Sequence, residues 1–254
     1  MNSLTGKVAL ITGCTGGIGK ATARSLARLG CSIAIHYNSA SHELVTALCE
    51  ELRAFGVKAE AFQADLSDYD GARKLHREVV EKMGNPDVLF NNAGIMGKFL
   101  GLEGSIYDIT PELFERTWRT NTGTHFLLTQ LCLPHMEEKK FGRIIFNSSV
   151  AAGTGGGVGP HYASSKSAMH GLLHWIAARY AKDGITCNAV APALIEGTNM
   201  LSDNHAIDTL KHRIPVGRLG RAEEIAAVVE LFVTNAYLTN KIIVADGGMV
   251  PSAF

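Results

Sequence analysis

The amino-acid sequence predicts an α/β fold: a single Rossmann-type domain with a doubly wound, seven-stranded parallel sheet and helices on both faces. Two observations carry this prediction. Short apolar runs of strand length alternate with longer segments of helical periodicity along most of the 254 residues. A glycine-rich turn lies between the first apolar run and the first helical segment. We therefore expect one domain over residues 1–254, a length that α/β folds reach with one large core.

The expected strands are short apolar runs bounded by turn residues. In chain order they are Val8–Ile11, Ser32–Ile35, Ala59–Phe62, Val88–Phe90, Arg143–Phe146, Thr186–Val190 and Lys241–Val244. The expected helices have apolar residues at helical spacing and are Lys20–Leu29, Glu43–Phe55, Gly71–Lys82, Pro111–Glu138, Tyr162–Ala181 and Ala222–Thr234. Strands that alternate with helices in this way form a parallel sheet.

Composition and charge argue against several classes of protein. Lys plus Arg and Asp plus Glu both number 24, so no basic excess favours nucleic acid or an anionic membrane surface as a partner. The 5 cysteines form no CxxC pair, which argues against a disulfide framework and against a metal site. No segment approaches the roughly 18 apolar residues of a membrane span, and neither the N-terminus nor Ser252–Phe254 matches a signal peptide or a peroxisomal address. We expect a cytoplasmic protein.

The glycine-rich turn Thr12–Gly19 follows the first expected strand directly. Gly13 and Gly19 would let the backbone turn tightly and approach a pyrophosphate, while the next helix offers free N–H groups and a favourable dipole. The same pattern alone is also compatible with a turn that binds no ligand.

A second motif, Asn91-Asn92-Ala93-Gly94, follows the fourth expected strand. Its small residues would let a cofactor lie across the strand ends. The asparagines could tie neighbouring strands together through bonds from side chain to backbone. Taken alone, the motif is equally compatible with a plain turn.

Tyr162 and Lys166 are four residues apart, which places both side chains on one face of a helix. A phenol with its usual pKa of about 10 transfers protons poorly near neutrality, and an adjacent ammonium favours the phenolate. The hydroxyl of Ser149, just after the fifth expected strand, could bond to the reacting oxygen. The tyrosine–lysine spacing also occurs by chance on solvated helices, so it gains weight only with the other motifs.

The order and spacing of these motifs, together with Asn121, resemble the short-chain dehydrogenase/reductase family from about Lys7 to Gly248. The resemblance implies that Tyr162 is the general acid/base and that Lys166 lowers its pKa and holds the nicotinamide ribose. It implies that Ser149 orients the substrate oxygen and that Asn121 helps to anchor a proton-relay water. It also implies a homotetramer or homodimer.

The resemblance further implies a set of cofactor-binding residues. Asp65 corresponds to the family's adenine-contacting acid, and the segment from Pro192 to Ile195 resembles its segment beside the nicotinamide. Ala193 replaces the usual glycine there, and Gly197 shifts Thr198 by one place. The full set is Thr12, Gly13, Gly17, Ile18, Gly19, Tyr37, Asn38, Ser39, Asp65, Leu66, Asn92, Ala93, Gly94, Tyr162, Lys166, Pro192, Ile195 and Thr198.

The end of the second expected strand favours NADP(H) over NAD(H). Sites that prefer NAD usually place an acid there, and this chain has Tyr37. Asn38, Ser39 and Ser41 could donate hydrogen bonds to a 2′-phosphate. Against this, no Arg or Lys occurs in the glycine-rich turn or directly after Tyr37. Among nearby histidines, His36 and His42 are candidates for the missing cation, although such histidines are more often surface residues.

The expected reaction is reduction of a ketone by NADPH, or in reverse oxidation of a secondary alcohol. The pattern is nearest to the 3-oxoacyl-[acyl-carrier-protein] reductase group, and Lys139, Lys140 and Arg143 could dock an acidic carrier protein. Asp183 opposes such docking at the following helix end. A cofactor-binding sensor without catalysis is the alternative from another class.

Two segments bear on the substrate. Residues 195–213 are polar and follow a strand end, and we expect them to form a substrate lid. Gly153–Gly159 would line the substrate side with little bulk, which hints at room for a sizeable or flat molecule.

Overall fold

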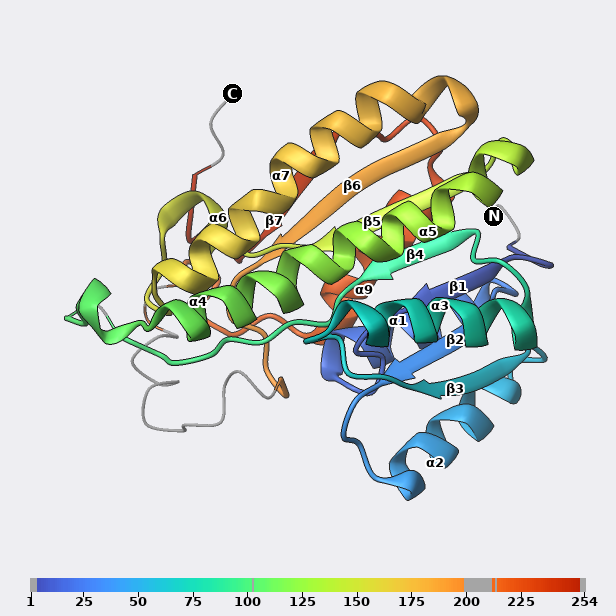
Figure 1. Ribbon diagram of the computed structural model, residues 1–254, viewed down its shortest axis with the longest axis horizontal. Helices are drawn as coiled ribbons and strands as arrows, with labels where there is room; N and C mark the ends of the chain where they lie inside the picture. Colours follow the sequence, from blue (N-terminus) through green and yellow to red (C-terminus); the bar gives the residue numbers. More distant parts are fainter. Residues whose placement is uncertain (1–3, 102, 199–211, 213, 252–254) are drawn as a thin grey trace.

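A computed structural model describes residues 4–101, 103–198, 212 and 214–251 of the protein. Seven parallel strands form one sheet in the order β3-β2-β1-β4-β5-β6-β7, with helices on both faces (Figure 1). The strands are β1 (Val8–Ile11), β2 (Ser32–Tyr37), β3 (Ala59–Gln63), β4 (Val88–Asn91), β5 (Gly142–Asn147), β6 (Ile185–Pro192) and β7 (Lys241–Ala245). The predicted fold class is confirmed. Because the order reverses between β1 and β4, their carboxyl ends border the crevice in which such sheets bind ligands.

Two apolar cores lie on opposite faces of the sheet. Helices α1 (Gly17–Arg28), α2 (His42–Arg53) and α9 (Ala222–Thr234) cover one face, and α3 (Tyr69–Met83), α5 (Thr124–Lys139) and α7 (Pro160–Tyr180) cover the other (Figure 1). Strand β1 divides its side chains between them, since Ala9 and Ile11 pack into the first core and Leu10 into the second. The central strands are buried on both faces, and this explains their continuous apolar runs in the sequence.

The prediction of one helix over Pro111–Glu138 is wrong at its centre. The structure has α4 (Pro111–Trp118), then a π-helical turn η2 (Arg119–Gly123), and then α5. The N–H of Thr124 bonds to the carbonyl of Arg119, five residues earlier, instead of the residue four earlier. Asn121 lies in this turn and bonds to residues outside the helix. The spacing of apolar residues does not depend on such tertiary hydrogen bonds. The helical spacing therefore continues through η2, and it predicted a single helix.

Three further short helical turns lie among the described residues, namely η1 (Ile106–Asp108), α6 (Ala151–Thr154) and η3 (Ala181–Asp183). Helix α6 takes up the beginning of Gly153–Gly159, which the sequence predicted as a loop. The rest of that segment pairs with the loop after β4, through backbone bonds of 3.0 and 2.9 Å between residues 100–101 and 157–158. Val158 packs against the small apolar cluster of Ala151, Tyr162 and Ala163, so the paired segments lie beside this cluster.

Part of the predicted lid, residues 199–211 and 213, lies outside the described residues, as does the C-terminal segment 252–254. Within the described ranges, no helix is long and apolar enough to cross a membrane. The same ranges hold no cluster of three or more side chains suited to a metal ion. All five cysteines are buried and free.

Candidate active site

The predicted cofactor residues of the described chain lie along the carboxyl edge of the sheet. They are Thr12, Gly13, Gly17, Ile18 and Gly19 after β1, Tyr37, Asn38 and Ser39 at the end of β2, Asp65 and Leu66 after β3, Asn92, Ala93 and Gly94 after β4, and Pro192, Ile195 and Thr198 at the end of β6. Because the strands are parallel, residues far apart in the sequence meet at this one edge.

Polar side chains tie together the carboxyl ends of β1, β4 and β5. The Thr12 hydroxyl oxygen accepts bonds from the N–H groups of Asn92 (2.8 Å) and Ala93 (2.9 Å). The Asn92 amide donates to the Thr12 carbonyl (2.8 Å) and accepts from the Asn147 amide at the end of β5 (2.9 Å). An asparagine therefore connects neighbouring strands, as the sequence suggested, and it fixes the backbone below the crevice.

The glycine-rich turn enters α1 with its first N–H groups free of side-chain caps. Gly13 has a left-handed backbone with φ +61°, and a side chain at Gly19 would overlap with the Gly13 carbonyl. Gly16 is the N-cap residue of α1, and no side chain accepts a hydrogen bond from the first N–H groups of the helix. A side chain at Gly17 would lie 3.6 Å from the methyl group of Thr198, so these two candidate pyrophosphate-binding segments are adjacent. Free helix N–H groups between such segments fit a pyrophosphate.

The ends of β2 and β3 form the adenosine side of the crevice. Tyr37 is the last residue of β2, and the next two residues, Asn38 and Ser39, are exposed. Asp65 is exposed after β3, and its carboxylate accepts a bond from the N–H of Ser67 (2.8 Å). This bond lowers the pKa of Asp65, so the side chain is ionised near neutrality and suits a hydrogen-bond donor.

His36 is neither a surface residue nor a cation for a 2′-phosphate, so both roles predicted for it are wrong. Its side chain is 2% exposed, and its ring nitrogens lie 2.9 Å from the N of Gly13 and 3.1 Å from the carbonyl oxygen of Ala64. Burial lowers the pKa of His36 to about 4. A histidine side chain at a strand end can point into the core or into solvent, and the sequence pattern does not show which of the two directions it takes. His42, the other candidate, is exposed at the start of α2.

Tyr162 and Ser149 meet beyond the carboxyl end of β5. Tyr162 lies in the first turn of α7, is 6% exposed and shares a hydrogen bond with the side chain of Ser149. Burial raises the pKa of Tyr162, and the bond to Ser149 offsets part of that rise. The Ser149 oxygen also accepts a bond from the N–H of Ala151 (3.2 Å). The hydroxyl hydrogen of Ser149 can therefore be directed at Tyr162 or at a substrate oxygen.

Lys166 lies one helical turn after Tyr162 and is 2% exposed. Its ammonium donates to the carbonyl of Asn147 (2.7 Å) and lies 5.7 Å from the centre of the Tyr162 ring. Burial lowers the pKa of Lys166 to about 8. A side chain at Gly94 would lie 3.4 Å from this nitrogen, so the glycine keeps the approach to Lys166 open. Burial is the largest influence on the pKa of Tyr162, and the expected lowering of that pKa by Lys166 stays a prediction.

Two side chains one helical turn apart hold the loop after β4. The Asn121 amide accepts from the N–H of Ile95 (2.8 Å) and donates to the Ile95 carbonyl (2.9 Å) and to the Ser165 hydroxyl (3.0 Å). His125 is fully buried, and its Nε2 lies 2.9 Å from the carbonyl oxygen of Ala93. His125 is not among the residues predicted from the sequence. Its position four residues after Asn121, on the same helix face, was a usable signal.

His161, directly before Tyr162, was also missed. Its Nε2 donates to the carbonyl of Met96 (3.0 Å), which joins α7 to the loop after β4. Its Nδ1 is buried and has no hydrogen-bond partner among the described residues. A side chain at Gly159 would lie 3.1 Å from this nitrogen. At least this glycine of the Gly153–Gly159 segment is therefore explained by close packing, without reference to substrate size.

The segment after β6 runs from Pro192 to Thr198 along the same edge of the sheet. Ile195 is buried and its backbone pairs with Gly220, so the first residue of the predicted lid is held against a residue that follows the lid in the chain. The Thr198 hydroxyl donates to the carbonyl of Ile195 (2.9 Å). This bond holds Thr198 beside the start of α1.

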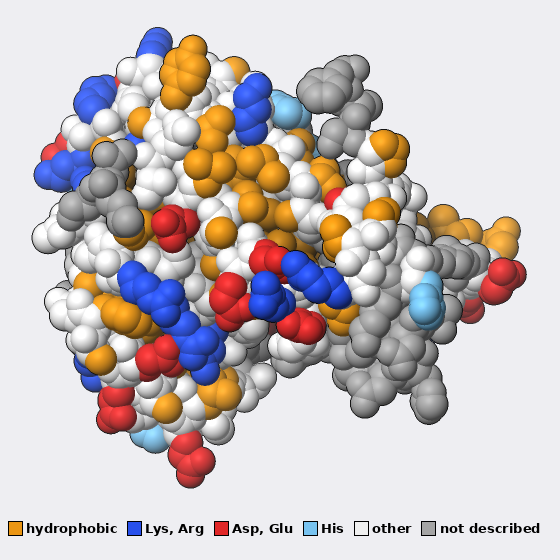
Figure 2. All heavy atoms as spheres, turned by 180° about the vertical axis from the view of Figure 1, so that it is seen from behind, with side chains coloured by type: hydrophobic (Ala, Val, Ile, Leu, Met, Phe, Trp, Pro, Cys, Tyr) orange, Lys and Arg blue, Asp and Glu red, His pale blue; other side chains and the backbone are white. Residues whose placement is uncertain are grey.

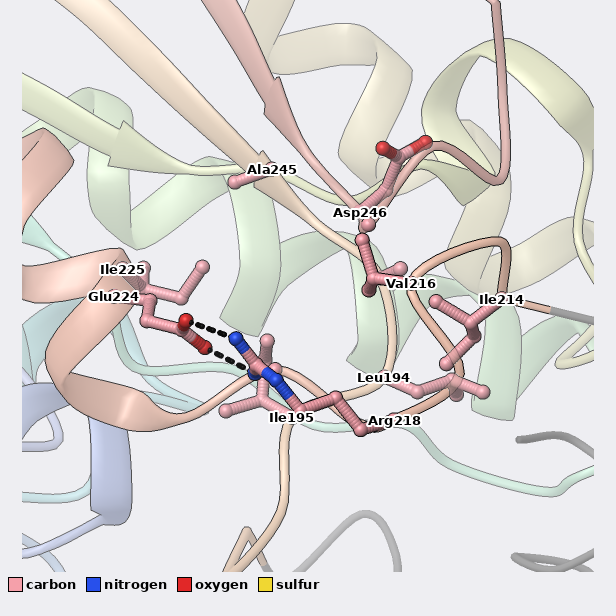
Figure 3. A pocket seen from close by; sticks show the side chains of 12 residues that line it. Leu194, Ile195, Ile214, Val216, Arg218, Glu224, Ile225, Ala245 and Asp246 are labelled. Atoms are coloured by element: carbon pink, nitrogen blue, oxygen red, sulfur yellow. Dashed lines mark hydrogen bonds and ion pairs between the residues drawn. The ribbon is translucent and has the colours of Figure 1, made fainter.

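A cavity of about 240 Å³ lies against this segment (Figure 3). Its apolar lining includes Leu194, Ile195, Ile214, Val216 and Ile225. An ion pair between Arg218 and Glu224, with N to O distances of 2.8 and 2.6 Å, lies at its edge. Neither Tyr162 nor Lys166 lines this cavity, so it is not the place where these groups act.

The expected docking cations for a carrier protein are mostly engaged elsewhere. Arg143 is 6% exposed and donates to the backbone carbonyls of Val233 (3.0 Å) and Gly184 (3.1 Å). Lys140 pairs with Asp183 (2.8 Å). Arg143 is therefore an internal residue, and its proposed role as a surface cation is wrong. A cation at the start of a strand can turn inward to satisfy carbonyl groups, which sequence position does not reveal.

Comparisons with known proteins agree on one family. The sequence model of that protein family, which is described as short chain dehydrogenase, matches residues 7–208 of this chain. An L-rhamnose 1-dehydrogenase (NADP(+)) from Thermoplasma acidophilum is 35% identical over 256 residues, with 98% of each chain covered. A 3-oxoacyl-[acyl-carrier-protein] reductase from Aquifex aeolicus is 36% identical over 252 residues, with 97% of this chain and 98% of the relative covered. The solved structure of a blue fluorescent protein from a metagenomic library in complex with NADPH is 35% identical, with a TM-score of 0.89 and coverage of 98% and 100%.

Proposed function

This chain belongs to the short-chain dehydrogenase family, and from that premise we propose that it reduces a ketone with NADPH and, in reverse, oxidises a secondary alcohol. Its relatives are named as dehydrogenases and reductases that use nicotinamide cofactors, and the chain is an NAD(P)-dependent oxidoreductase. One observation carries the finer proposal: Tyr162 and Ser149 share a hydrogen bond beyond β5, with the Lys166 ammonium beside the Tyr162 ring.

Tyr162 is the proposed acid and base. A reduced nicotinamide, when bound, supplies a hydride to the carbonyl carbon. As that carbon is reduced, its oxygen gains negative charge and takes the hydroxyl proton of Tyr162. Ser149 donates a hydrogen bond to the same oxygen, because its own oxygen is already held by the Ala151 N–H. In the oxidative direction, the tyrosinate takes the proton back from the alcohol.

Lys166 has two proposed tasks. The first is to stabilise the tyrosinate that remains after proton transfer, since a cation 5.7 Å from the ring lowers the energy of that anion in a site screened from water. The second is to bind hydroxyl groups of the nicotinamide ribose, which the small Gly94 beside the ammonium would admit. Asn121 would support both tasks by holding the backbone of the loop after β4.

The proposed preference for NADPH rests on the end of β2. No carboxylate lies between Tyr37 and Ser41 to repel a 2′-phosphate, and Asn38 and Ser39 are exposed there. The Ser41 oxygen accepts a bond from the N–H of Leu44 (3.3 Å), so its hydroxyl hydrogen stays available to a phosphate. One relative is named for NADP(+), and one similar solved structure holds NADPH.

We propose a free small molecule as the substrate. A carrier-bound acyl group is less well supported, because Arg143 is buried and Lys140 is paired. The relatives' names point to two different chemistries, a sugar oxidised at carbon 1 and a 3-oxoacyl thioester. Both contain the same reacting unit, a carbon bonded to an oxygen that gains or loses a proton.

The test is a panel of initial rates followed by the absorbance of the reduced nicotinamide. The panel contains ketones, secondary alcohols, aldoses and 3-oxoacyl thioesters, the last with and without a carrier protein. We expect turnover of free ketones, with kcat/KM for NADPH at least about tenfold above that for NADH. A preference for NADH would overturn the cofactor assignment. Tight cofactor binding without turnover anywhere in the panel would instead favour a non-catalytic binding protein.

The family expectation of a homotetramer or homodimer also stays a proposal, supported by exposed apolar surface. Strand β7 is an edge strand of the sheet, and its Val244 is 38% exposed. Phe126 on α5 and Trp175 on α7 are 48% and 61% exposed. Apolar side chains also gather on the face seen in Figure 2. Light scattering at micromolar concentration would give a multiple of the chain mass, and a strictly monomeric mass would contradict the proposal.

A further inference from the structure

His36 bonds to two consecutive N–H groups of the glycine-rich turn. Its Nδ1 accepts from the N–H of Gly13 (2.9 Å), and its backbone carbonyl accepts from the N–H of Cys14 (2.8 Å). Its Nε2 lies 3.1 Å from the carbonyl oxygen of Ala64, directly after β3. One buried ring thus connects the segments that follow β1 and β3 from a position near the end of β2.

The two ring contacts fix which nitrogen carries the hydrogen. An N–H group can only donate, so Nδ1 of His36 must be unprotonated to accept from Gly13. A carbonyl can only accept, so Nε2 must carry the hydrogen that it donates to Ala64. The ring is therefore neutral, and its low pKa of about 4 agrees with this state at neutral pH. A neutral ring with both nitrogens bonded to backbone is not available to bind a phosphate.

The bond to Gly13 means that both backbone polar groups of this residue, its N–H and its carbonyl, have hydrogen-bond partners. Gly13 has a left-handed backbone, which glycine can leave easily because it lacks a side chain. Its carbonyl accepts from the N–H of Gly16 (3.1 Å) and from the Asn92 amide (3.2 Å). Its N–H is held by His36. Loss of the imidazole would leave this N–H without its acceptor and the turn with fewer restraints.

We propose that His36 is a positioning residue that sets the glycine-rich turn for the pyrophosphate of the dinucleotide through its bond to Gly13, without touching the cofactor. This inference rests on the proposed function for the identity of the ligand. Preorganised backbone donors bind an anion more tightly than mobile ones, because less ordering is required on binding. The effect of His36 should therefore appear in cofactor affinity and be absent from the chemical step.

Three substitutions separate the two ring contacts. In His36→Asn, the side-chain oxygen is as many bonds from the backbone as Nδ1 and can still accept from Gly13. In His36→Gln, the amide nitrogen is as many bonds away as Nε2 and can still donate to Ala64, while the bond to Gly13 is lost. His36→Leu removes both contacts. His135→Gln, near the far end of α5 from the site, is the matched control.

Binding is measured directly by titration of the full-length protein with NADPH, so the result does not depend on the substrate. We expect dissociation constants within about threefold of wild type for His36→Asn and His135→Gln, and at least about tenfold higher for His36→Gln and His36→Leu. At saturating cofactor, kcat and the ketone KM of His36→Gln should stay within about twofold of wild type. A role limited to folding would lower the melting temperature without this split between binding and kcat.

Several outcomes would overturn the inference. They are equal binding by all three variants, weakening by His36→Asn as large as that by His36→Gln, or a fall in kcat at saturating cofactor. If His36→Leu does not fold, the comparison of the Asn and Gln variants still decides the question. Failure of the wild-type protein to bind any nicotinamide dinucleotide would instead refute the proposed function, so the two failures are distinguishable.

Discussion

The two ends of the crevice differ in how they satisfy their polar groups. At the adenosine end, in which we include the glycine-rich turn, the neutral side chain of His36 bonds to the backbone of that turn. At the reaction end, Tyr162 and Lys166 are buried, and burial moves both pKa values in the direction that disfavours charge. Five buried side-chain atoms lack a partner among the described residues, and three are at this end: Asn91 Oδ1, Asn147 Oδ1 and His161 Nδ1.

This difference indicates a division between scaffold and chemistry. Buried polar atoms without partners and buried charges destabilise a fold. The buried groups of the reaction end therefore lower the stability of the folded protein. The hydrogen bonds of the adenosine end raise it. Substitutions at the reaction end should reduce activity without reducing stability. Substitutions at the adenosine end should reduce cofactor binding and stability together.

Tyr162→Phe should have the largest effect on rate. Loss of the general acid/base should lower kcat by about 100- to 10,000-fold. The NADPH dissociation constant and the free energy of unfolding should stay close to wild type, because only one hydroxyl is removed. Steady-state kinetics, cofactor titration and urea unfolding measure the three quantities. A kcat within tenfold of wild type would remove Tyr162 from its proposed role.

Lys166→Met should separate activity from stability most clearly. We expect kcat/KM to fall by about 100-fold or more, because the cation beside Tyr162 is lost. The free energy of unfolding at pH 7 should rise by about 1 to 2 kcal/mol, since the buried ammonium is replaced by an apolar chain and only the bond to Asn147 is lost. A variant that loses both activity and stability would contradict the contrast between the two ends.

Gly19→Ala tests the adenosine end. The added methyl group would overlap with the Gly13 carbonyl, and such overpacking costs about 1 to 3 kcal/mol of stability. NADPH binding should weaken with it, because the turn must shift. Gly171→Ala is the matched control: no atom lies within 4 Å of the added methyl on α7, and the change should stabilise the helix by about 0.5 to 1 kcal/mol. Normal NADPH binding by a folded Gly19→Ala variant would argue against this turn as the pyrophosphate site.

The pH dependence of stability tests the buried charge of Lys166 directly. The pKa of Lys166 is about 8 in the folded protein and 10.5 for a free side chain, so the unfolded chain takes up its proton first as pH falls. Stability from this residue is therefore present above about pH 10.5 and is lost as pH falls through about 8. Urea unfolding of wild type and Lys166→Met between pH 7 and 10 should show a difference that grows toward the lower pH. A difference independent of pH would mean that Lys166 keeps its usual pKa.

The sequence predicted the sheet well because its signals are local. Each strand is an apolar run, and Gly16 and Gly19 make room for backbone atoms of the same turn after β1. The positions of Tyr162, Ser149 and Lys166 followed from spacing and from the family resemblance. The roles of these residues remain predictions that the substitutions above would test.

The features that sequence did not show depend on long-range contacts. His36 and Arg143 both turn inward to backbone groups far along the chain, the first to Gly13 and the second to Val233. A residue's type and neighbours do not determine such a direction. The pKa of Tyr162 depends on long-range contacts too, since burial is its largest influence and burial follows from packing that no short motif encodes.

The π-helical turn η2 has a consequence for how the site is aligned. Each residue rotates an α-helix by about 100°, so one extra residue offsets α4 from α5 by more than a quarter of a revolution. Helix α4 consequently lies against α7, while α5 lies against α3 and β5. Deleting a single residue of η2 would change the composition of the helical segment α4-η2-α5 very little. It would nevertheless rotate Asn121 or His125 away from the loop after β4, which these two side chains hold. The positions of Asn121 and His125 thus depend on how far α4 is rotated relative to α5 about the helix axis, as well as on the residue type at each position.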